Sequence, residues 1–511
     1  MLAKVWSAAT HGIDAVRIVI EVDAAQSQTP GFALVGLPDA AVRESYRRVR
    51  SALHNCGFWL PPRYITVNLS PADVKKEGSA FDLPIALGIL HATEFLREEH
   101  IAGRVFVGEL SLDGTVAPVH GALSISAAFA KQEDVRELIV PASNANEAAA
   151  VRSVRVIGAW TLPALLAHLL GQVPIEPAAS SVAVDAPFES ADFAEVRGQA
   201  QAKRALEVAA AGGHNILMIG PPGSGKTMLA RRLPSVLPRL SLEESIVTTK
   251  IHSIAGTLPA GSGLLMRRPF RAPHHTISTA GLVGGGTPPR PGEVSLSHHG
   301  VLFLDELAEF RRDTLEVMRQ PMEDGLVTIG RVTRTTTFPS RFTLAAALNP
   351  CPCGFFNDVR HECLCSPLQI SRYLTKISGP LLDRIDLQVE VPALTPEEIS
   401  STAAGEASAL IRERVENARA VQRERFRRSV LQCNAEMTPR HLRKFCELDA
   451  ASRRILDHAV TRLGLSARAY DRILKVSRTI ADLAGADRIE SSHAAEAVHY
   501  RALDKAYFRS C

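Results

Sequence analysis

The sequence has little net charge for its length and no segment apolar enough to enter a membrane. Its 511 residues include 58 Lys and Arg against 54 Asp and Glu, so any basic surface that attracts nucleic acid must be local. It has no run of about 18 uncharged apolar residues. The first residues lack the apolar core and small-residue cleavage site of a signal peptide. We therefore expect a cytoplasmic protein that has no membrane partner.

Cysteine is scarce outside one short segment. Four of the eight cysteines fall within 15 residues and the other four are scattered. In a chain without an export signal, this clustering favours a metal site over disulfides. The composition, 46% hydrophobic and 22% charged, is typical of a soluble globular protein. At about 150 residues per domain, the length predicts two to four domains.

Blocks of different pattern follow one another along the chain, without an internal repeat. Residues 1–170 mix strand-like runs with helical stretches, which indicates an α/β or α+β unit. Residues 171–190 are rich in Pro, Ala and Ser and are predicted to be a linker. Residues 394–511 have few strand formers and are predicted to be helical. Between them, residues 191–393 contain short apolar runs typical of central strands in a parallel sheet, at 215–219, 300–305 and 342–348.

A nucleotide-binding motif directly follows the first of these apolar runs. Residues 220–227 read GPPGSGKT and match the pattern G-x-x-x-x-G-K-[ST] in full. The alternative, a Gly-Pro turn before a helix, is less favoured because the strand at 214–219 stands where a phosphate-binding loop needs one. In such a loop backbone N–H groups cradle phosphate oxygens, the lysine reaches the β- and γ-phosphates, and the Thr hydroxyl ligates Mg²⁺. We expect ATP and Mg²⁺ to bind at Gly220, Pro221, Pro222, Gly223, Ser224, Gly225, Lys226 and Thr227.

An acidic pair ends the second apolar run. Asp305 is placed to hold Mg²⁺, directly or through water, and Glu306 to orient and activate the attacking water. Acids at strand ends are common, so the pair alone is a weak signal. Its position 78 residues after Thr227 makes it a strong one.

Three segments resemble the magnesium-chelatase/MCM branch of AAA+ ATPases: LDEL at 304–307, ALNPCPCG at 347–354 and SGPLLDRIDL at 378–387. The resemblance implies that Asn349 is the sensor-1 residue, which touches the γ-phosphate or the water. It also implies that Arg384 is an arginine finger that reaches the neighbouring subunit's ATP. Arg468, in the helical block, resembles the sensor-2 arginine. For both arginines the alternative is a salt-bridged helix residue. Because an arginine finger acts between subunits, we expect a homo-hexamer.

The first block extends the resemblance to nearly the whole chain. Its segments at 32–45, 65–87 and 107–123 resemble the ComM/YifB family, in which this block is similar to the Lon protease domain. Lon proteases use a Ser–Lys dyad. The alignment places Ala80 at the serine position and Ser79 one residue out of register, and the counterpart of the lysine segment, 118–130, contains no lysine. We expect a proteolytically inactive scaffold for ring assembly or DNA contact. Rescue of the activity by Ser79 with another base is the alternative.

The clustered cysteines directly follow Asn349. Four thiolates suit tetrahedral structural Zn²⁺, although the C-x-C spacing departs from the usual C-x₂-C. His361 is an alternative ligand, and reduced cysteines without metal are the alternative interpretation. Zinc here would stiffen the loop rather than perform chemistry. The candidate ligands are Cys351, Cys353, Cys363 and Cys365.

Several segments are candidates for DNA contact. Residues 267–286 resemble the helix-2 insertion of this branch, a pore-facing element in related motors. Thr, Val and Ile alternate around Gly330, which predicts a β-hairpin over 323–341. Arg331 and Arg334 either track a phosphate backbone or are solvated.

The remaining charged and histidine-rich segments are less specific. Residues 411–454 carry twelve Arg and Lys against six Asp and Glu, a face for DNA, solvent or another subunit. Adjacent histidines point in different directions on regular elements, so we interpret the pairs His274–His275 and His298–His299 as loop or interface residues rather than metal ligands.

The family resemblance implies a hexameric, ATP-dependent helicase that promotes branch migration in homologous recombination during natural transformation. Its expected partners are single-stranded and branched DNA, further copies of itself, and recombination proteins. One alternative is the ATPase motor of a magnesium-chelatase-like metal-insertion complex, although that motor subunit lacks the Lon-like block. The other is an ATP-dependent Lon-type protease, which Ala80 disfavours.

Overall fold

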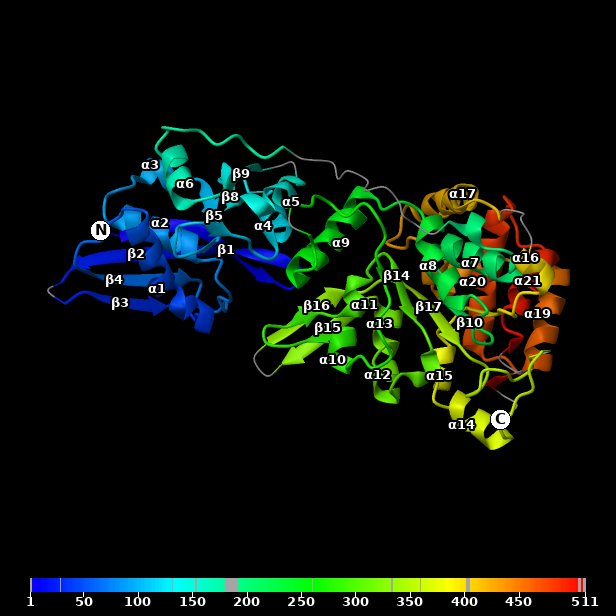
Figure 1. The fold of residues 1–511 in the computed structure, drawn as a ribbon. Coiled ribbons are helices and arrows are strands. Elements are labelled where there is room, and N and C mark those ends of the chain that lie inside the picture. Colours follow the sequence, from blue (N-terminus) through cyan, green and yellow to red (C-terminus); the bar gives the residue numbers. More distant parts are fainter. Residues whose placement is uncertain are drawn as a thin grey trace.

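The computed structural model describes residues 2–27, 29–130, 132–151, 154–179, 192–259, 261–331, 334–358, 360–400, 405–503 and 507–508. The larger part of the predicted linker, from residue 180 onward, lies outside them. Figure 1 shows the first sheet in blue and cyan, the second sheet in green, and a helical C-terminal part in orange and red. The predicted fold class is confirmed, since the molecule is mixed α/β with a parallel sheet and a helical C-terminal region. None of the helices in the described ranges is long and apolar enough to cross a bilayer.

A seven-stranded sheet occupies the first part of the chain, in the order β3-β4-β2-β1-β5-β8-β9. Strands β1 and β2 form a long antiparallel hairpin, whereas β5, β8 and β9 run parallel. Every residue of helix α2 is buried, which accounts for its apolar sequence on all sides. The strands are β1 (Leu2–His11), β2 (Asp14–Gln26), β3 (Gly31–Val35), β4 (Arg63–Ser70), β5 (Arg104–Phe106), β8 (Glu137–Pro141) and β9 (Arg155–Ala159), with a small hairpin of β6 (Glu109–Leu110) and β7 (Val116–Ala117). The helices are α1 (Ala40–Asn55), α2 (Asp82–Ala92), α3 (Glu98–Ile101), α4 (Ala122–Phe129), α5 (Ala145–Ala149) and α6 (Leu162–Leu169).

The second sheet has five parallel strands in the order β11-β14-β17-β10-β18. Its three central strands are the apolar runs predicted from the sequence, and all their residues are buried. Two short edge strands complete it. The bounds are β10 (Ile216–Ile219), β11 (Phe270–Arg271), β14 (Val301–Leu304), β17 (Thr343–Leu348) and β18 (Leu387–Glu390).

Helices and two small hairpins surround this second sheet. The helices before the last strand are α7 (Ala200–Gly212), α8 (Lys226–Val236), α9 (Leu242–Ala255), α10 (Thr279–Val283), α11 (Glu293–Leu296), α12 (Arg312–Glu316), α13 (Arg319–Asp324), α14 (Pro367–Leu374) and α15 (Gly379–Leu382). The hairpins are β12 (Gly284–Gly285) with β13 (Arg290–Pro291), and β15 (Leu326–Arg331) with β16 (Arg334–Pro339). After β18 the described chain is helical, with α16 (Pro396–Ser400), α17 (Ser408–Phe426), α18 (Pro439–Phe445), α19 (Ala450–Leu463), α20 (Ala467–Leu483) and α21 (Ser491–His499).

Helix α9 joins the two sheets into one body, as Figure 1 shows. The Gly121 backbone N–H, at the start of α4, donates to the Ser253 hydroxyl at 2.9 Å. That hydroxyl donates in turn to the buried carboxylate of Glu147. On the same helix, Lys250 forms an ion pair with Asp14 at 3.0 Å. The first part of the chain is therefore attached to a helix beside the second sheet rather than held only by the linker.

Candidate nucleotide site and cysteine cluster

Parallel strands bring the predicted nucleotide-binding residues to one edge of the second sheet. The glycine-rich loop follows β10, Asp305 follows β14, and Asn349 follows β17. Because these three strands are neighbours and parallel, their carboxyl ends lie side by side. Ligands of open α/β sheets bind outside this edge.

The glycine-rich loop packs tightly against the sheet and then opens helix α8. A Cβ at Gly220 would lie 2.1 Å from the Val391 carbonyl oxygen, so only glycine fits there. Lys226, the first residue of α8, donates from Nζ to the carbonyl oxygens of Gly220 at 2.7 Å and Pro221 at 2.8 Å. It also reaches the Asn349 Oδ1 at 3.2 Å. The loop lysine and the predicted sensor-1 residue are therefore in direct contact beside the loop.

Burial lowers the pKa of Lys226 to about 8, although the nearby carboxylates of Asp305 and Glu306 act in the opposite direction. Phosphate oxygens near Nζ would favour the charged ammonium. Nucleotide binding would therefore raise the pKa of Lys226.

Thr227 and Asp305 form the pair expected to hold Mg²⁺. The Thr227 hydroxyl donates to the Asp305 Oδ2 at 2.7 Å. Neighbouring ligands of an octahedral Mg²⁺ lie about 3 Å apart, and Mg²⁺ prefers such oxygen donors. These two side chains would hold the ion, which in a phosphate site neutralises charge on the β- and γ-oxygens.

Glu306 stands at the turn that follows β14, with a left-handed φ of 51°. Its backbone N–H donates to the Asp305 Oδ1 at 3.0 Å, and its side chain is about half exposed. The Glu306 Oε2 lies 3.4 Å from Nδ1 of His275. No pattern in the sequence indicates this contact, because the pair His274–His275 has the features only of loop or interface residues.

Arg384 lies at the opposite edge of the sheet. Asn215, which precedes β10, donates to the Arg384 carbonyl oxygen at 3.0 Å, so Arg384 sits at the amino ends of the strands. Its residue exposure is 5%, and its guanidinium donates to the Pro380 carbonyl and to Glu323. Among the described residues its Nε has no hydrogen-bond partner. With β10 between them, roughly 13 Å of strand separates this arginine from its own glycine-rich loop.

A cavity of about 440 Å³ opens beside Arg384 at this amino edge. Arginine and lysine side chains from distant segments line it: Arg268, Arg341, Arg384, Arg419, Arg472 and Lys475. Arg472 on α20 forms an ion pair with Asp386, and Arg468 is exposed one turn earlier on the same helix. The two arginines predicted to act on nucleotide are thus not brought to the chain's own loop.

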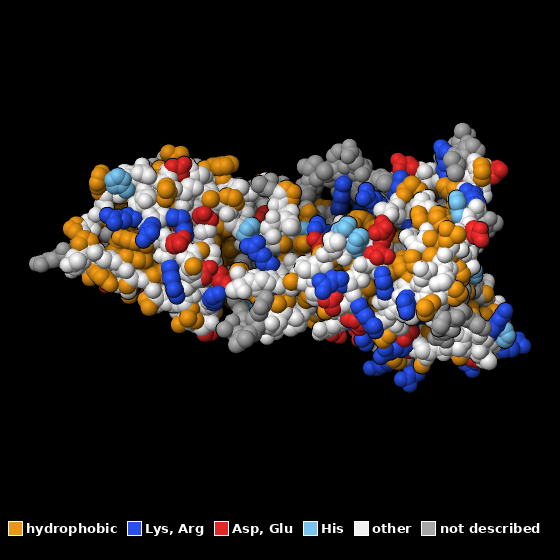
Figure 2. Space-filling model, turned by 60° about the horizontal axis from the view of Figure 1, so that its bottom comes forward, with side chains coloured by type: hydrophobic (Ala, Val, Ile, Leu, Met, Phe, Trp, Pro, Cys, Tyr) orange, Lys and Arg blue, Asp and Glu red, His pale blue; other side chains and the backbone are white. Residues whose placement is uncertain are grey.

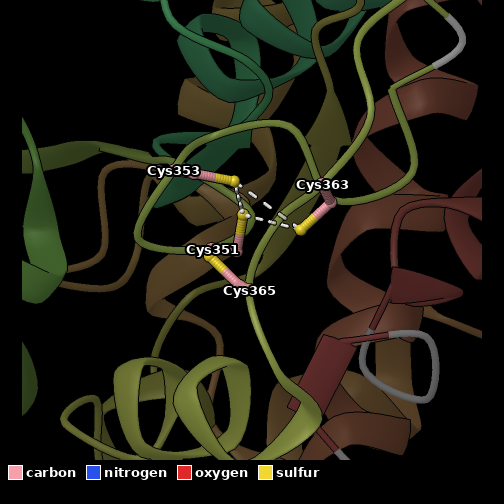
Figure 3. Close-up of side chains that lie close together, drawn as sticks. All are labelled: Cys351, Cys353, Cys363 and Cys365. Carbon is pink, nitrogen blue, oxygen red and sulfur yellow. Dashed lines mark hydrogen bonds between the residues drawn. The ribbon is translucent and has the colours of Figure 1, made fainter.

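The four clustered cysteines converge, as Figure 3 shows. The Cys351 Sγ lies 3.3 Å from that of Cys353 and 3.7 Å from that of Cys363, and all four sulfur atoms lie within 4.8 Å of one another. Tetrahedral Zn²⁺ with Zn–S bonds of about 2.3 Å has sulfur atoms about 3.8 Å apart. This cluster could therefore hold a metal ion. His361, the alternative ligand, is not part of it and lies against Asp358.

The cysteine loop also packs on the glycine-rich loop. Gly354 has a φ of 85°, and a Cβ there would lie 2.4 Å from Cδ of Pro222. The loop starts directly after Asn349. The cysteine loop is therefore connected to the nucleotide site twice. Gly354 packs on Pro222 of the glycine-rich loop, and the segment itself begins next to Asn349.

The hairpin predicted around Gly330 is present as β15 and β16, with Arg331 paired to Arg334 at its tip. The side chains of both arginines, and residues 332 and 333, lie outside the described part of the chain. The hairpin lies beside the first part of the chain, since a Cβ added at Gly12 would lie 3.4 Å from the carbonyl oxygen of Thr337 on β16.

In the Lon-like block, the Ser79 hydroxyl donates to the Glu109 carboxylate rather than to a base such as lysine. Lys76, the nearest buried lysine in the sequence, donates to the Pro71 carbonyl. Ala80 accepts a backbone hydrogen bond from Gly108 and offers no nucleophile. The described residues thus form no Ser–Lys dyad around Ala80.

The basic segment 411–454 separates into two sets. Four arginines are partly buried as residues and have protein partners: Arg412, Arg414, Arg419 and Arg425. Eight side chains are exposed: Arg423, Arg427, Arg428, Arg440, Arg443, Lys444, Arg453 and Arg454. Figure 2 shows several groups of Lys and Arg side chains on the part of the molecule built by the ATPase core and the C-terminal helices.

Comparison with known proteins gives matches along nearly the whole chain. Models of the magnesium chelatase subunit ChlI match residues 20–144 and 192–399, and a model of its C-terminal part matches 405–501. The competence protein ComM of Haemophilus influenzae is 46% identical over 508 residues, 98% of each chain. The chain belongs to the ComM/YifB family. The Escherichia coli relative YifB is 42% identical over 505 residues, 99% of this chain and 98% of its own length.

The family assignment identifies the ATPase core as a magnesium-chelatase-like AAA+ domain. A shorter similarity concerns an archaeal Lon protease of Methanothermobacter thermautotrophicus, 37% identical over 73 residues, 14% of this chain and 11% of that protease. This chain thus shares a limited stretch with a protease, while the ATPase core contains the nucleotide site described above.

Proposed function

We propose that this protein is a ring-forming, ATP-driven motor that moves on DNA and promotes branch migration during recombination. The observation that carries the proposal is the division of the predicted ATPase residues between opposite edges of one sheet. Lys226, Asp305, Glu306 and Asn349 lie at the carboxyl edge, and Arg384 lies at the amino edge. A guanidinium that stabilises the transferred phosphoryl group must then come from a neighbouring copy.

DNA as the substrate is supported by charge and by relatives. Eight arginines and lysines between residues 423 and 454 are exposed, although the net charge of the whole chain is only +4. The β15–β16 hairpin carries two further arginines at its tip. The name of the Haemophilus influenzae relative refers to competence. A role in natural transformation is therefore part of the proposal.

ATP turnover with and without DNA tests the proposal. We expect single-stranded, forked and four-way-junction DNA to stimulate hydrolysis. We also expect labelled four-way junctions to be separated into duplexes by branch migration in the presence of ATP and Mg²⁺. Lys226→Ala should lose ATP binding, whereas Arg384→Ala should keep binding and lose turnover. Rings of Glu306→Gln protein that bind ATP but never DNA would exclude DNA as the substrate.

A metal-chelatase motor is the second candidate, because the family models that match most of the chain describe magnesium chelatase subunits. It predicts turnover that is indifferent to DNA and that responds to partner subunits bearing a porphyrin. The comparison of ATPase rates with and without DNA separates the two candidates.

We also propose that the cysteine cluster binds one structural Zn²⁺ per chain. The convergence of four sulfur atoms at distances close to a tetrahedral set supports this. Elemental analysis of purified protein should give one zinc per chain, and Cys363→Ser should reduce that value.

A further inference from the structure

One face of helix α1, in the first part of the chain, carries a row of arginines without partners. Arg43, Arg47, Arg50 and His54 follow one another at intervals of three or four residues, so they form one stripe along the helix, and all four are exposed. Within the described residues, none of the three guanidinium groups of the stripe forms a hydrogen bond or an ion pair. Arg48 on the same helix is instead held by the buried carboxylate of Asp82 at 2.7 Å. The stripe is therefore free to bind a ligand.

The charge of this stripe is positive over a length that suits several phosphates. Glu44 is the only acidic residue in the sequence of α1, and it lies about 60° or more around the helix axis from each arginine of the stripe. Arg43 and Arg50 are seven residues apart, which is about 10 Å along the helix. Since a nucleic-acid strand carries one phosphate per about 3.4 Å, this length faces about three phosphates.

An exposed tryptophan follows the stripe. Trp59 is 78% exposed, and its ring centroid lies 4.4 Å from that of His54, with the two rings at 70° to each other. The turn between them is closed by backbone hydrogen bonds, from the N–H of Gly57 to the His54 carbonyl at 3.0 Å and from the N–H of Phe58 to the Leu53 carbonyl at 2.9 Å. The indole is therefore held in solvent at the end of the arginine row, although its apolar surface favours burial.

We propose that this α1 face, made of Arg43, Arg47, Arg50, His54 and Trp59, binds single-stranded DNA. The three guanidinium groups pair with phosphates, and the indole stacks on an unpaired base, which an intact duplex does not offer. His54 supports the indole from the helix. The inference rests on the proposed DNA motor and adds a DNA contact outside its ATPase core, since Figure 1 shows α1 on the first sheet, away from the second sheet. A strand held there cannot pair again while a junction moves.

Binding of a fluorescent thymidine oligonucleotide to the full-length protein, with a non-hydrolysable ATP analogue and at several salt concentrations, tests the charges. Replacing Arg43, Arg47 and Arg50 together by Gln should weaken binding. It should also reduce the slope of log affinity against log salt by about 2, since each phosphate contact of a single strand contributes about 0.7. Glu44→Gln removes the only acid and should tighten binding. Arg136→Gln, at an exposed arginine before β8, is the control for Arg47→Gln and should change neither affinity nor slope.

The tryptophan has a different signature in the same assay. Trp59→Leu should weaken binding of the oligonucleotide about tenfold at every salt concentration and leave the slope unchanged, because stacking releases no counterions. Trp59→Phe keeps an aromatic face and should retain most of the affinity. Binding of a duplex of the same length should change less than twofold in Trp59→Leu protein.

The outcomes separate this inference from the proposed motor. If wild type binds the oligonucleotide and the triple arginine variant binds it equally well, the α1 site is overturned and the DNA motor stands. Failure of wild type to bind DNA would overturn both. Mass measurement should show the same assembly for the triple variant, with an unchanged basal ATPase rate. A variant that no longer assembles would identify the stripe as a contact between copies, and an equal loss of duplex binding in Trp59→Leu protein would exclude stacking on an unpaired base.

Discussion

Burial changes the acid–base behaviour of Lys226, whose pKa falls to about 8 beside the glycine-rich loop. Phosphate oxygens stabilise the ammonium, so the pKa of this lysine rises when ATP binds. Below pH 8 the lysine is charged in both states and does not make ATP affinity depend on pH. Above pH 8, ATP binding takes up a proton, and affinity should fall by up to about tenfold per pH unit. Measured dissociation constants for ATP between pH 7 and 9.5 check this.

Lys226→Arg is the control for that titration. A guanidinium keeps its charge across this range, so any affinity that remains should not vary with pH. A wild-type dissociation constant that is flat to pH 9.5 would contradict the assigned role of burial.

At the scale of residues, the sequence predicted the members of the nucleotide site better than their contacts. The residues from Gly220 to Thr227 follow one another along the chain, so a local pattern identifies them. The approach of Lys226 to Asn349 requires knowing that β10 and β17 are neighbours. The contact between His275 and Glu306 joins two turns, one after β11 and one after β14, that are far apart in the sequence. No periodicity in the sequence carries that information.

The cysteine loop and the glycine-rich loop behave as one unit, because Gly354 leaves no space between itself and Pro222. Gly354→Ala combines a left-handed backbone, which costs about 1–2 kcal/mol for other residues, with a clash on the nucleotide loop. We expect a several-fold loss of ATP affinity, measured with a fluorescent nucleotide. Gly57→Ala is the matched control, since its φ of 88° is nearly the same and nothing lies within 4 Å of the added Cβ.

Metal removal should act on the same unit. If the four sulfur atoms hold zinc, a strong chelator should lower ATP affinity while the circular dichroism of the remaining helices and sheets persists. Cys363→Ser should have the same effect, whereas Cys56→Ala, in the first part of the chain, should not. Unchanged ATP binding after complete zinc loss would show that the loop holds its shape without metal.

At the scale of elements, strands buried on both faces can be predicted from the sequence, and short or exposed edge strands cannot. Strands β10, β14 and β17 are central and apolar throughout, so each stands out as a short run. Strand β18 ends in an exposed glutamate and β11 has two residues, and both escape such a pattern. In the long hairpin, β2 contains an apolar run typical of a strand at residues 18–22, whereas β1 mixes small and polar residues and lacks such a pattern.

For the whole molecule, the separation of Arg384 from Lys226 predicts complementation between two inactive variants. Lys226→Ala subunits keep Arg384, and Arg384→Ala subunits keep the nucleotide site. Random mixing at equal amounts pairs an intact nucleotide site with an intact arginine at about one interface in four, so about a quarter of the wild-type ATPase rate should return. Lys226→Ala mixed with the double variant should stay inactive. An inactive first mixture would place Arg384 in its own subunit's chemistry.

Placing the two halves of the site on opposite edges of one sheet also constrains symmetry. When subunits meet end to end, a contact that joins a carboxyl edge to an amino edge is heterologous, so the assembly has a direction. A chain of subunits that has not closed leaves one nucleotide without an arginine at one end and one arginine without a nucleotide at the other. Hydrolysis would then reach its full rate only once the ring has closed, with any bound DNA already inside it.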